Sequence, residues 1–358
     1  MKELEDLKDG HVQVLRGCER ATDRVHVFDK NALLAMEAAL AARRPLLVRG
    51  EPGTGKSQLA LAAATSLGRP LLSYVVNSRT TAQDLLWSFD AVARLAEAQL
   101  AGALQRLARS THGEGTAAAH EAKPGSSRDT QVSRQQQSIE DVRQLLDERR
   151  FVTPGPLWWA LDWRSAEAHA AAYRCPIPER PQGWDTTQGT VVLIDEIDKA
   201  ESDVPNGLLE VLGMGRFRPQ GYPEPFQICG AEQPLILITT NEERALPDAF
   251  VRRCLVLNLQ LPTDDRELEA FLIARGRAHF QSSEHHSVEN KADDAVLQAA
   301  ARQLIKDRND LKARSLPPPG QAEYLDLVRA VIRLRRDREE QLQLLKELSN
   351  YVFQKHPE

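Results

Sequence analysis

One short segment has the residue types and spacing needed to bind phosphate. Gly50, Gly55, Lys56 and Ser57 stand at the fixed positions of the pattern G-x-x-x-x-G-K-S/T. Glycines let backbone N–H groups turn toward one centre, the lysine reaches phosphate oxygens, and the hydroxyl is a ligand for Mg²⁺. The segment therefore predicts a phosphate-binding loop. Its candidate binding residues are Gly50, Glu51, Pro52, Gly53, Thr54, Gly55, Lys56, Ser57 and Gln58.

Two adjacent carboxylates, Asp195 and Glu196, follow the apolar run at 191–194. Ligands of open α/β sheets bind beyond the carboxyl ends of the strands. Asp195 is suited to hold Mg²⁺ together with Ser57, and Glu196 is suited to orient and deprotonate an attacking water. Alone, Asp195 is equally suited to cap the next helix. Beside a phosphate loop, the pair favours hydrolysis of a nucleotide.

The elements that must position these residues alternate along the chain. Apolar runs predict buried strands, with helical patterns between them at 31–42, 57–67 and 91–108. Such alternation predicts an α/β fold with a parallel sheet flanked by helices. The phosphate loop lies between a strand and a helix, which is the context it requires. The predicted strands are 46–48, 71–76, 191–194, 235–239 and 255–259.

The length of 358 residues is sufficient for two domains. We predict an α/β nucleotide-binding domain over residues 1–262 and a small all-helical domain over 263–358, with a helix break at Pro317–Gly320. Residues 110–138 contain almost no large apolar side chain, which predicts a flexible insertion in the first domain.

Composition limits the location and the partners. A net charge of −5 argues against binding of nucleic acid by the whole surface. No apolar run approaches the 18 residues of a membrane span, and the first ten residues do not resemble a signal peptide. The cysteines, Cys18, Cys175, Cys229 and Cys254, are scattered, as is usual in a reducing compartment. We therefore expect a soluble cytoplasmic protein.

The order of the motifs resembles the AAA+ ATPases. After the phosphate loop and the Asp-Glu pair comes a strand ending Ile238-Thr-Thr-Asn241, and then the segment Leu246–Arg253. Two further segments resemble the MoxR or dynein-related (AAA_5-like) branch of that superfamily. One is Phe151-Val-Thr-Pro-Gly-Pro-Leu157, and the other is Leu208–Gly213, which leads through Arg216-Phe217 toward a hairpin.

The resemblance implies roles that the residues alone do not. Asn241 would help to position the attacking water, and Arg252 or Arg253 would reach the γ-phosphate held by a neighbouring subunit. It also implies ATP and Mg²⁺ as ligands, a hexameric ring, a helical lid, and remodelling or assembly of a partner protein, often one with a von Willebrand factor A (VWA) domain. Each of these roles has a simpler alternative. Asn241 could be a turn residue, and the two arginines could belong to an exposed helix end.

The chain departs from the family where a lid helix normally opens with an arginine. Gln321 stands at that position, and Arg314 is the candidate substitute. Three aromatic side chains, Trp158, Trp159 and Trp163, are expected to pack in a core. Tyr222 and Phe226 either pack or grip a client at the tip of the hairpin.

Two other functions remain open. One is a McrB-like motor directed to nucleic acid, with GTP as a possible substrate because the phosphate loop does not read the base. The other is a nucleotide-dependent switch or scaffold with little turnover. The net charge of −5 argues against the motor directed to nucleic acid, and Glu196 argues against the switch or scaffold.

Overall fold

The computed structural model describes residues 4, 7–15, 24–113, 143–227, 233–281 and 292–352. The chain forms two compact units. The first comprises Met1–Thr80, Pro178–Leu209 and Gly230–Glu358. The second comprises Thr81–Ile177 and Glu210–Cys229, so it is made of two segments inserted into the first.

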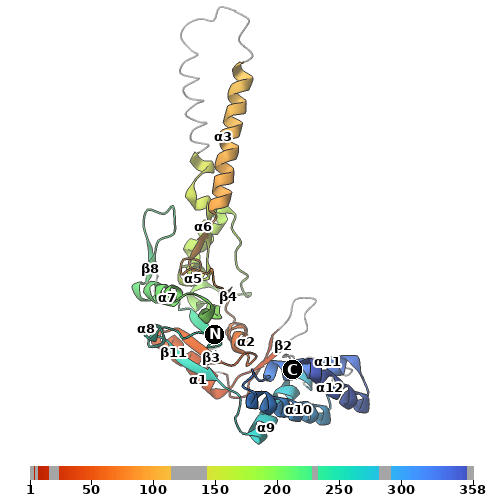
Figure 1. Ribbon diagram of the computed structural model, residues 1–358. Coiled ribbons are helices and arrows are strands. Elements are labelled where there is room, and N and C mark those ends of the chain that lie inside the picture. Colours follow the sequence, from red (N-terminus) through yellow and green to blue (C-terminus); the bar gives the residue numbers. More distant parts are fainter. Residues whose placement is uncertain are drawn as a thin grey trace, which may run out of the picture. The chain divides into compact units, whose positions relative to one another are not determined.

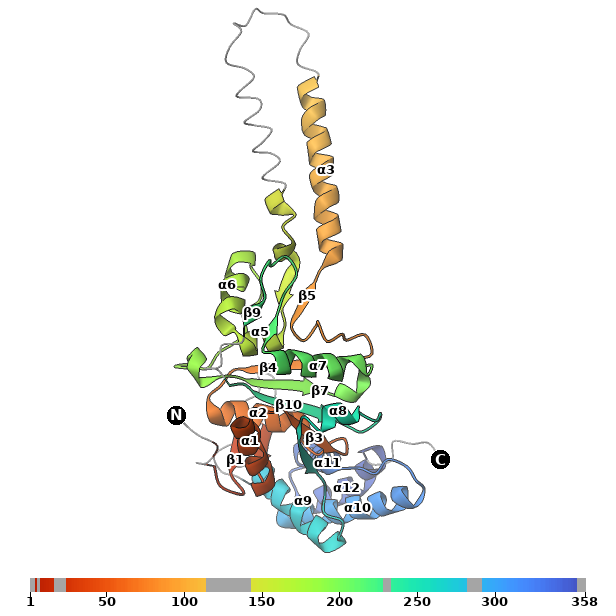
Figure 2. The same cartoon turned by 90° about the vertical axis from the view of Figure 1, so that its left-hand side faces the viewer.

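A five-stranded parallel sheet forms the centre of the first unit, in the order β11-β3-β10-β7-β4 (Figure 2). The prediction of a parallel sheet is confirmed, and all five of its strands coincide with predicted apolar runs. Parallel strands bring their carboxyl ends to one edge, where Gly50, Asp195 and Thr240 end their strands. The strands are β3 Leu46–Gly50, β4 Leu71–Val75, β7 Val191–Asp195, β10 Leu235–Thr240 and β11 Leu255–Leu259.

Both faces of the central strands β3, β10 and β7 are buried along their apolar runs, whereas the edge strands β4 and β11 also carry exposed residues such as Ser73 and Asn258. One face packs against helices α1 (Lys30–Ala42) and α2 (Lys56–Leu67) in a single hydrophobic core. Small side chains on α2 allow that helix to lie close to the sheet. The opposite face buries Leu47, Val192, Ile194, Ile236 and Ile238.

The ends of these two helices follow from local chemistry. Asp29 caps α1, because its carboxylate accepts a 2.7 Å hydrogen bond from the Ala32 N–H. Gly68 ends α2 in the left-handed region at φ 65°, where glycine carries no Cβ penalty. The beginning of α2 at Lys56 places the phosphate loop directly against the helix N-terminus.

In the described part of the chain beyond the last strand of the sheet, four helices pack together around a separate hydrophobic core (Figure 1). Tyr324 is its largest fully buried side chain. The predicted break at Pro317–Gly320 is confirmed, since it separates the second of these helices from the third. The helices are α9 Asp265–Phe280, α10 Asp294–Ala313, α11 Gln321–Leu334 and α12 Arg338–Val352.

The core of the C-terminal helices begins at Leu261, close to the predicted domain boundary at residue 262, but the compact units are divided elsewhere. The helices beyond residue 262 belong to the same unit as the sheet. The second unit is taken instead from within the predicted domain 1–262. Sequence patterning identified the change from α/β to helical structure but not the insertion of a compact unit.

The second unit is organised around aromatic side chains. Trp158 is fully buried, and its ring lies 5.3 Å from that of Phe226 and 6.0 Å from that of Tyr222. The expectation that the tryptophans are core residues is confirmed, and Tyr222 and Phe226 pack on this core. The strands and helices are β5 Trp87–Phe89, α3 Ala91–Gly113, β6 Val152–Pro154, α5 Pro156–Leu161, α6 Trp163–Tyr173, β8 Arg216–Phe217 and β9 Phe226–Gln227.

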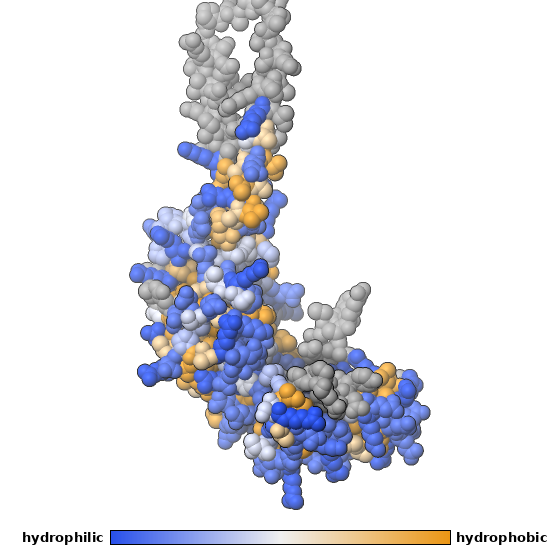
Figure 3. Space-filling model, viewed as in Figure 1, coloured by the Kyte–Doolittle hydropathy of each residue, from blue (hydrophilic) through white to orange (hydrophobic). Residues whose placement is uncertain are grey.

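Helix α3 is longer than the sequence predicted. We expected a helix over 91–108, but α3 continues to Gly113 and so includes the first residues of the predicted insertion at 110–138. The rest of that insertion lies outside the described residues. The side chains of Val92, Leu95 and Leu100 on α3 are exposed, and Figure 3 shows apolar residues on this helix. Its apolar side is thus left uncovered by the described part of its unit.

Shorter elements complete the chain. Strands β5 and β6 pair in antiparallel fashion, as do β8 and β9, and the latter pair confirms the predicted hairpin. Helix α7 runs from the first unit into the second. The remaining elements are β1 Val12–Leu15, β2 Arg24–Val27, η2 Glu148–Phe151, η3 Thr186–Gln188, η4 Ile197–Lys199, α7 Asp203–Met214 and α8 Asp248–Val251. Throughout the described ranges, no helix is long and apolar enough to cross a membrane.

Candidate functional site

The phosphate loop connects β3 to α2 through three glycines in the left-handed region. Gly50, Gly53 and Gly55 have φ values of 154°, 78° and 92°. At Gly50 a side chain is also excluded by space, because a Cβ would lie 2.3 Å from the Leu259 carbonyl oxygen. These glycines permit the tight turn that directs backbone N–H groups inward.

Lys56 opens α2 and is buried beneath this turn. Its Nζ donates hydrogen bonds of 2.7 Å to the Gly50 carbonyl and 3.0 Å to the Glu51 carbonyl. Burial lowers the pKa of Lys56 from its usual value, and the neighbouring carboxylates, Asp195 foremost, oppose that shift. The acidic neighbours thus favour the charged ammonium that a phosphate site needs.

Ser57 and Asp195 meet at the carboxyl end of the sheet, as the sequence predicted. The Ser57 hydroxyl donates to Oδ1 and Oδ2 of Asp195 at 2.9 and 2.8 Å. Thr239, on the neighbouring strand β10, donates to Oδ1 of the same carboxylate. Three side chains from α2, β7 and β10 therefore converge on one point.

This group of oxygens is suited to Mg²⁺. The metal prefers hard oxygen ligands and in nucleotide sites uses one or two carboxylates together with phosphate oxygens and water. Ser57 and Asp195 supply a hydroxyl and a carboxylate side by side. Among the described residues, no group of three or more His, Cys, Asp and Glu is placed to hold a metal ion.

Glu196 follows Asp195 in a strained conformation. Its φ of 60° and ψ of 49° lie in the left-handed region, which costs an ordinary residue about 1–2 kcal/mol. Its backbone N–H donates to Thr239 Oγ1 at 2.9 Å. The carboxylate accepts a 2.6 Å hydrogen bond from Lys199 Nζ and a 3.3 Å hydrogen bond from Asn241 Nδ2. The strained turn brings the carboxylate to the amide of Asn241.

Asn241 is itself held by a buried carboxylate. Oδ2 of Asp198 accepts hydrogen bonds from the backbone N–H groups of Asn241 at 3.2 Å and Glu243 at 3.0 Å. Asp198 is only 2% exposed. It therefore fixes the turn that carries Asn241.

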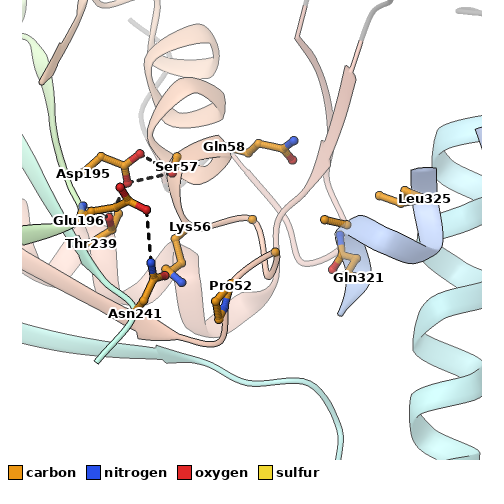
Figure 4. A pocket seen from close by; sticks show the side chains of 13 residues that line it. Pro52, Lys56, Ser57, Gln58, Asp195, Glu196, Thr239, Asn241, Gln321 and Leu325 are labelled. Carbon is orange, nitrogen blue, oxygen red and sulfur yellow. Dashed lines mark hydrogen bonds between the residues drawn. The ribbon is translucent and has the colours of Figure 1, made fainter. Parts of the chain in front are cut away.

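A cavity of about 320 Å³ joins these groups (Figure 4). That volume lies within the range of small-molecule sites. Figure 4 shows Glu196 and Asn241 on one side of Lys56, and Gln321 and Leu325 of α11 across the loop. The lining residues are Pro52, Gly53, Gly55, Lys56, Ser57, Gln58, Asp195, Glu196, Thr239, Asn241, Gln321, Ala322 and Leu325.

The two candidates for the residue that a lid helix normally brings to the nucleotide, Gln321 and Arg314, lie in different places. Gln321 begins α11 and lines the cavity. Arg314 is exposed at the end of α10 and is absent from the lining. Of the predicted loop residues, Gly50, Glu51 and Thr54 belong to the turn without lining the cavity. The structure therefore brings Gln321, and not Arg314, to the loop.

The paired arginines lie outside this cavity. Arg252 and Arg253 are exposed at the end of α8. Their backbone carbonyls accept hydrogen bonds from the guanidinium group of Arg44, which also donates to the Cys254 carbonyl at 3.2 Å. Arg44 thus fixes the backbone that presents both arginines.

The sequence analysis assigned no role to Thr239, Asp198, Lys199 or Arg44. Thr239 lies beside the predicted residues at a strand end, and that position was a usable signal. Asp198 and Lys199 lie just beyond the acidic pair, so their position was also a usable signal. Arg44 is more than 200 residues from its partners, and no local pattern indicates that contact.

The chain was compared with known protein families, curated proteins and solved structures. The family model described as "AAA domain (dynein-related subfamily)" matches residues 45–254, more than half of the chain. No curated protein matches the sequence. Among the matching solved structures is one described as the "crystal structure of a putative ATPase" from Cytophaga hutchinsonii. It has 12% sequence identity and a TM-score of 0.34, with 90% of this chain and 79% of that chain covered.

Proposed function

The chain belongs to the dynein-related subfamily of AAA domains, and from this premise we propose that it hydrolyses ATP. One observation carries the proposal: Lys56, Ser57 and Asp195 meet Glu196 and Asn241 around a single cavity. A binding loop alone would hold a nucleotide. A carboxylate beside an amide, at the same cavity, supplies the groups needed to activate water.

The chain's residues divide the work of binding. Lys56 exchanges the carbonyls of Gly50 and Glu51 for phosphate oxygens, which offer it full negative charge. Ser57 and Asp195 would hold Mg²⁺, which when bound supplies positive charge against the β- and γ-phosphates. The loop N–H groups and the N-terminus of α2 add further positive potential.

Hydrolysis requires a base and an oriented water. Water attacks the γ-phosphorus, a P–O bond forms, the β–γ bridging bond breaks, and ADP leaves. Glu196 accepts the proton of the attacking water, while the Asn241 amide orients that water. The 2.6 Å hydrogen bond from Lys199 uses one acceptor site of Oε2 and leaves other acceptor sites of the carboxylate for the attacking water.

Assembly into a ring would complete the site. The exposed Arg252 and Arg253 lie outside their own cavity, which favours a role at the site of a neighbouring copy. We propose a MoxR-like hexameric ring that remodels or assembles a partner protein, with a VWA-domain protein as the candidate partner. The hairpin β8–β9 is compatible with that branch. The scattered cysteines, of which Cys175 and Cys254 are free, favour the cytoplasm as its location.

The test replaces Glu196 with Gln and measures ATP turnover and assembly size with ATP bound. Loss of the base is expected to reduce turnover by about 10²–10⁴-fold while nucleotide binding persists. Glu201→Gln is the matched control, since that side chain is 75% exposed and its ion pair with Arg244 spans 3.6 Å. Assembly on ATP without turnover in the wild type would replace the hydrolase with a switch or scaffold.

A further inference from the structure

A buried arginine on α10 contacts the phosphate loop. Arg308 is 4% exposed, and its Nη2 donates a 2.6 Å hydrogen bond to Oε2 of Glu51. Its Nη1 donates at 2.8 Å to the Pro319 carbonyl, just before α11. Burying a guanidinium group is unfavourable unless it is paired and hydrogen-bonded. The two contacts are therefore the ones that make this burial tolerable.

The segment held through Pro319 lies against the same loop. The Ala322 N–H donates at 3.1 Å to the Gly53 carbonyl, so the first turn of α11 uses the loop as its hydrogen-bond partner. A Cβ on Gly320 would lie 3.2 Å from the Pro52 carbonyl oxygen. The hydrogen bonds of Arg308 are thus among several contacts that join the C-terminal helices to the turn that would receive the phosphates.

Glu51 is the point at which these contacts meet. Its carbonyl accepts Lys56 Nζ at 3.0 Å and the Thr54 hydroxyl at 2.9 Å, while its carboxylate accepts Arg308. A carboxylate in a phosphate loop is unfavourable by itself, because it repels the ligand's negative charge. The Glu51 side chain is 46% exposed, so solvent screens only part of that repulsion.

We propose that Arg308 is a positioning residue of the nucleotide site. It cancels the charge of Glu51 within the phosphate loop and holds the start of α11, with Gln321, at the cavity. The inference rests on the proposed nucleotide function and adds to it a specific pair, Arg308 and Glu51. Arg308 acts through Glu51 and Pro319 and does not touch the ligand.

The experiment compares Arg308→Met, Glu51→Gln and the double variant, with Arg302→Met as the matched control. Arg302 lies on the same helix, 70% exposed, and pairs with Glu269 away from the loop. The readouts are the dissociation constant of a fluorescent ATP analogue, kcat and KM for ATP, and hydrogen exchange at the Ala322 amide without nucleotide.

Arg308→Met is expected to weaken analogue binding and raise KM by tenfold or more, because it leaves Glu51 uncompensated beside the phosphates. Glu51→Gln removes that repulsion, so the double variant should recover at least half of the lost binding free energy. Exchange at Ala322 should be faster in both variants that lack Arg308. Arg302→Met should match the wild type in every readout.

Two results would overturn the proposal. One is wild-type affinity and wild-type Ala322 protection in Arg308→Met. The other is weakened binding that Glu51→Gln does not restore, since that pattern indicates a structural role alone. If the wild type binds no ATP analogue, the proposed function fails instead. In that case, hydrogen exchange at the Ala322 amide still tests whether Arg308 holds the start of α11. An unchanged exchange rate in Arg308→Met would refute this part of the proposal as well.

Discussion

Glu196 combines backbone strain with a side chain that has two partners. The left-handed conformation points its carboxylate toward Lys199 and Asn241. The hydrogen bond to Glu196 is the main reason that the pKa of Lys199 is raised. Both side chains of this ion pair are partly exposed, at 41% and 29%. Such pairs exchange readily with water, so the pairing is compatible with a carboxylate that also binds the attacking water.

The strain itself can be measured by comparing two truncations of this residue. Glu196→Ala and Glu196→Gly both remove the carboxylate and its contacts. Only glycine adopts φ near 60° without a Cβ clash, so Glu196→Gly should be more stable than Glu196→Ala by about 1 kcal/mol. Urea unfolding of the two variants gives this difference directly. Equal or greater stability of Glu196→Ala would show that the turn is not strained.

At the scale of elements, the sequence predicted what depends on local pattern. Each of the five strands of the sheet contains an apolar run, and the phosphate loop has fixed spacing, so both were recognised. Strands β8 and β9 are two residues each, too short for a periodic signal. The order of the sheet and the Arg308–Glu51 contact depend on pairing between distant segments. Periodicity carries no information on such pairing.

His169, on α6, shows how such an unpredicted contact organises the second unit. Its Nε2 faces the Val152 carbonyl at 2.8 Å, so that nitrogen must carry the proton and donate. Nδ1 then accepts from the Tyr222 hydroxyl at 2.6 Å. Burial raises the pKa of Tyr222 to about 12, which keeps this donor protonated at neutral pH. The β8–β9 hairpin is thus attached to α6 through a neutral imidazole.

This attachment predicts a dependence on acid. Burial, first of all, lowers the pKa of His169, with a smaller contribution from Arg149, while the Val152 hydrogen bond and Asp147 oppose the shift. The folded state therefore resists protonation, so stability is full above the usual histidine pKa near 6.5 and falls as the pH drops below it. The loss cannot exceed about 1.4 kcal/mol per pH unit from this one group.

The measurement is urea unfolding of the wild type and of His169→Gln at pH 7.5 and 5.5. Glutamine retains a donor for the Val152 carbonyl but does not titrate. The wild type is expected to lose more stability between the two pH values than the variant. Parallel losses would assign the acid sensitivity to other groups.

At the scale of the whole molecule, the role proposed for Arg252 and Arg253 requires a second copy of the chain. They are exposed and stand outside the cavity of their own chain. Arg44 holds their backbone through the carbonyls of residues 252–254. A misplacement of about 1 Å in such a group can reduce the rate by about 10²-fold. Arg44→Gln is therefore expected to lower kcat by about 10–100-fold while ATP affinity stays unchanged.

Mixing of subunits separates a role at the neighbour's site from a role within the same chain. An Arg44→Gln subunit retains its own Glu196, and a Glu196→Gln subunit retains well-placed arginines. If a Glu196→Gln subunit places its arginines at the site of a neighbouring Arg44→Gln subunit, that site is complete. The ATPase activity of the mixture should therefore exceed the mean of the activities of the two variants. Arg244→Gln, with a 58% exposed side chain, is the control and should leave kcat unchanged. A mixture that only averages its parents would confine the effect of Arg44 to its own subunit and remove the argument for a shared site.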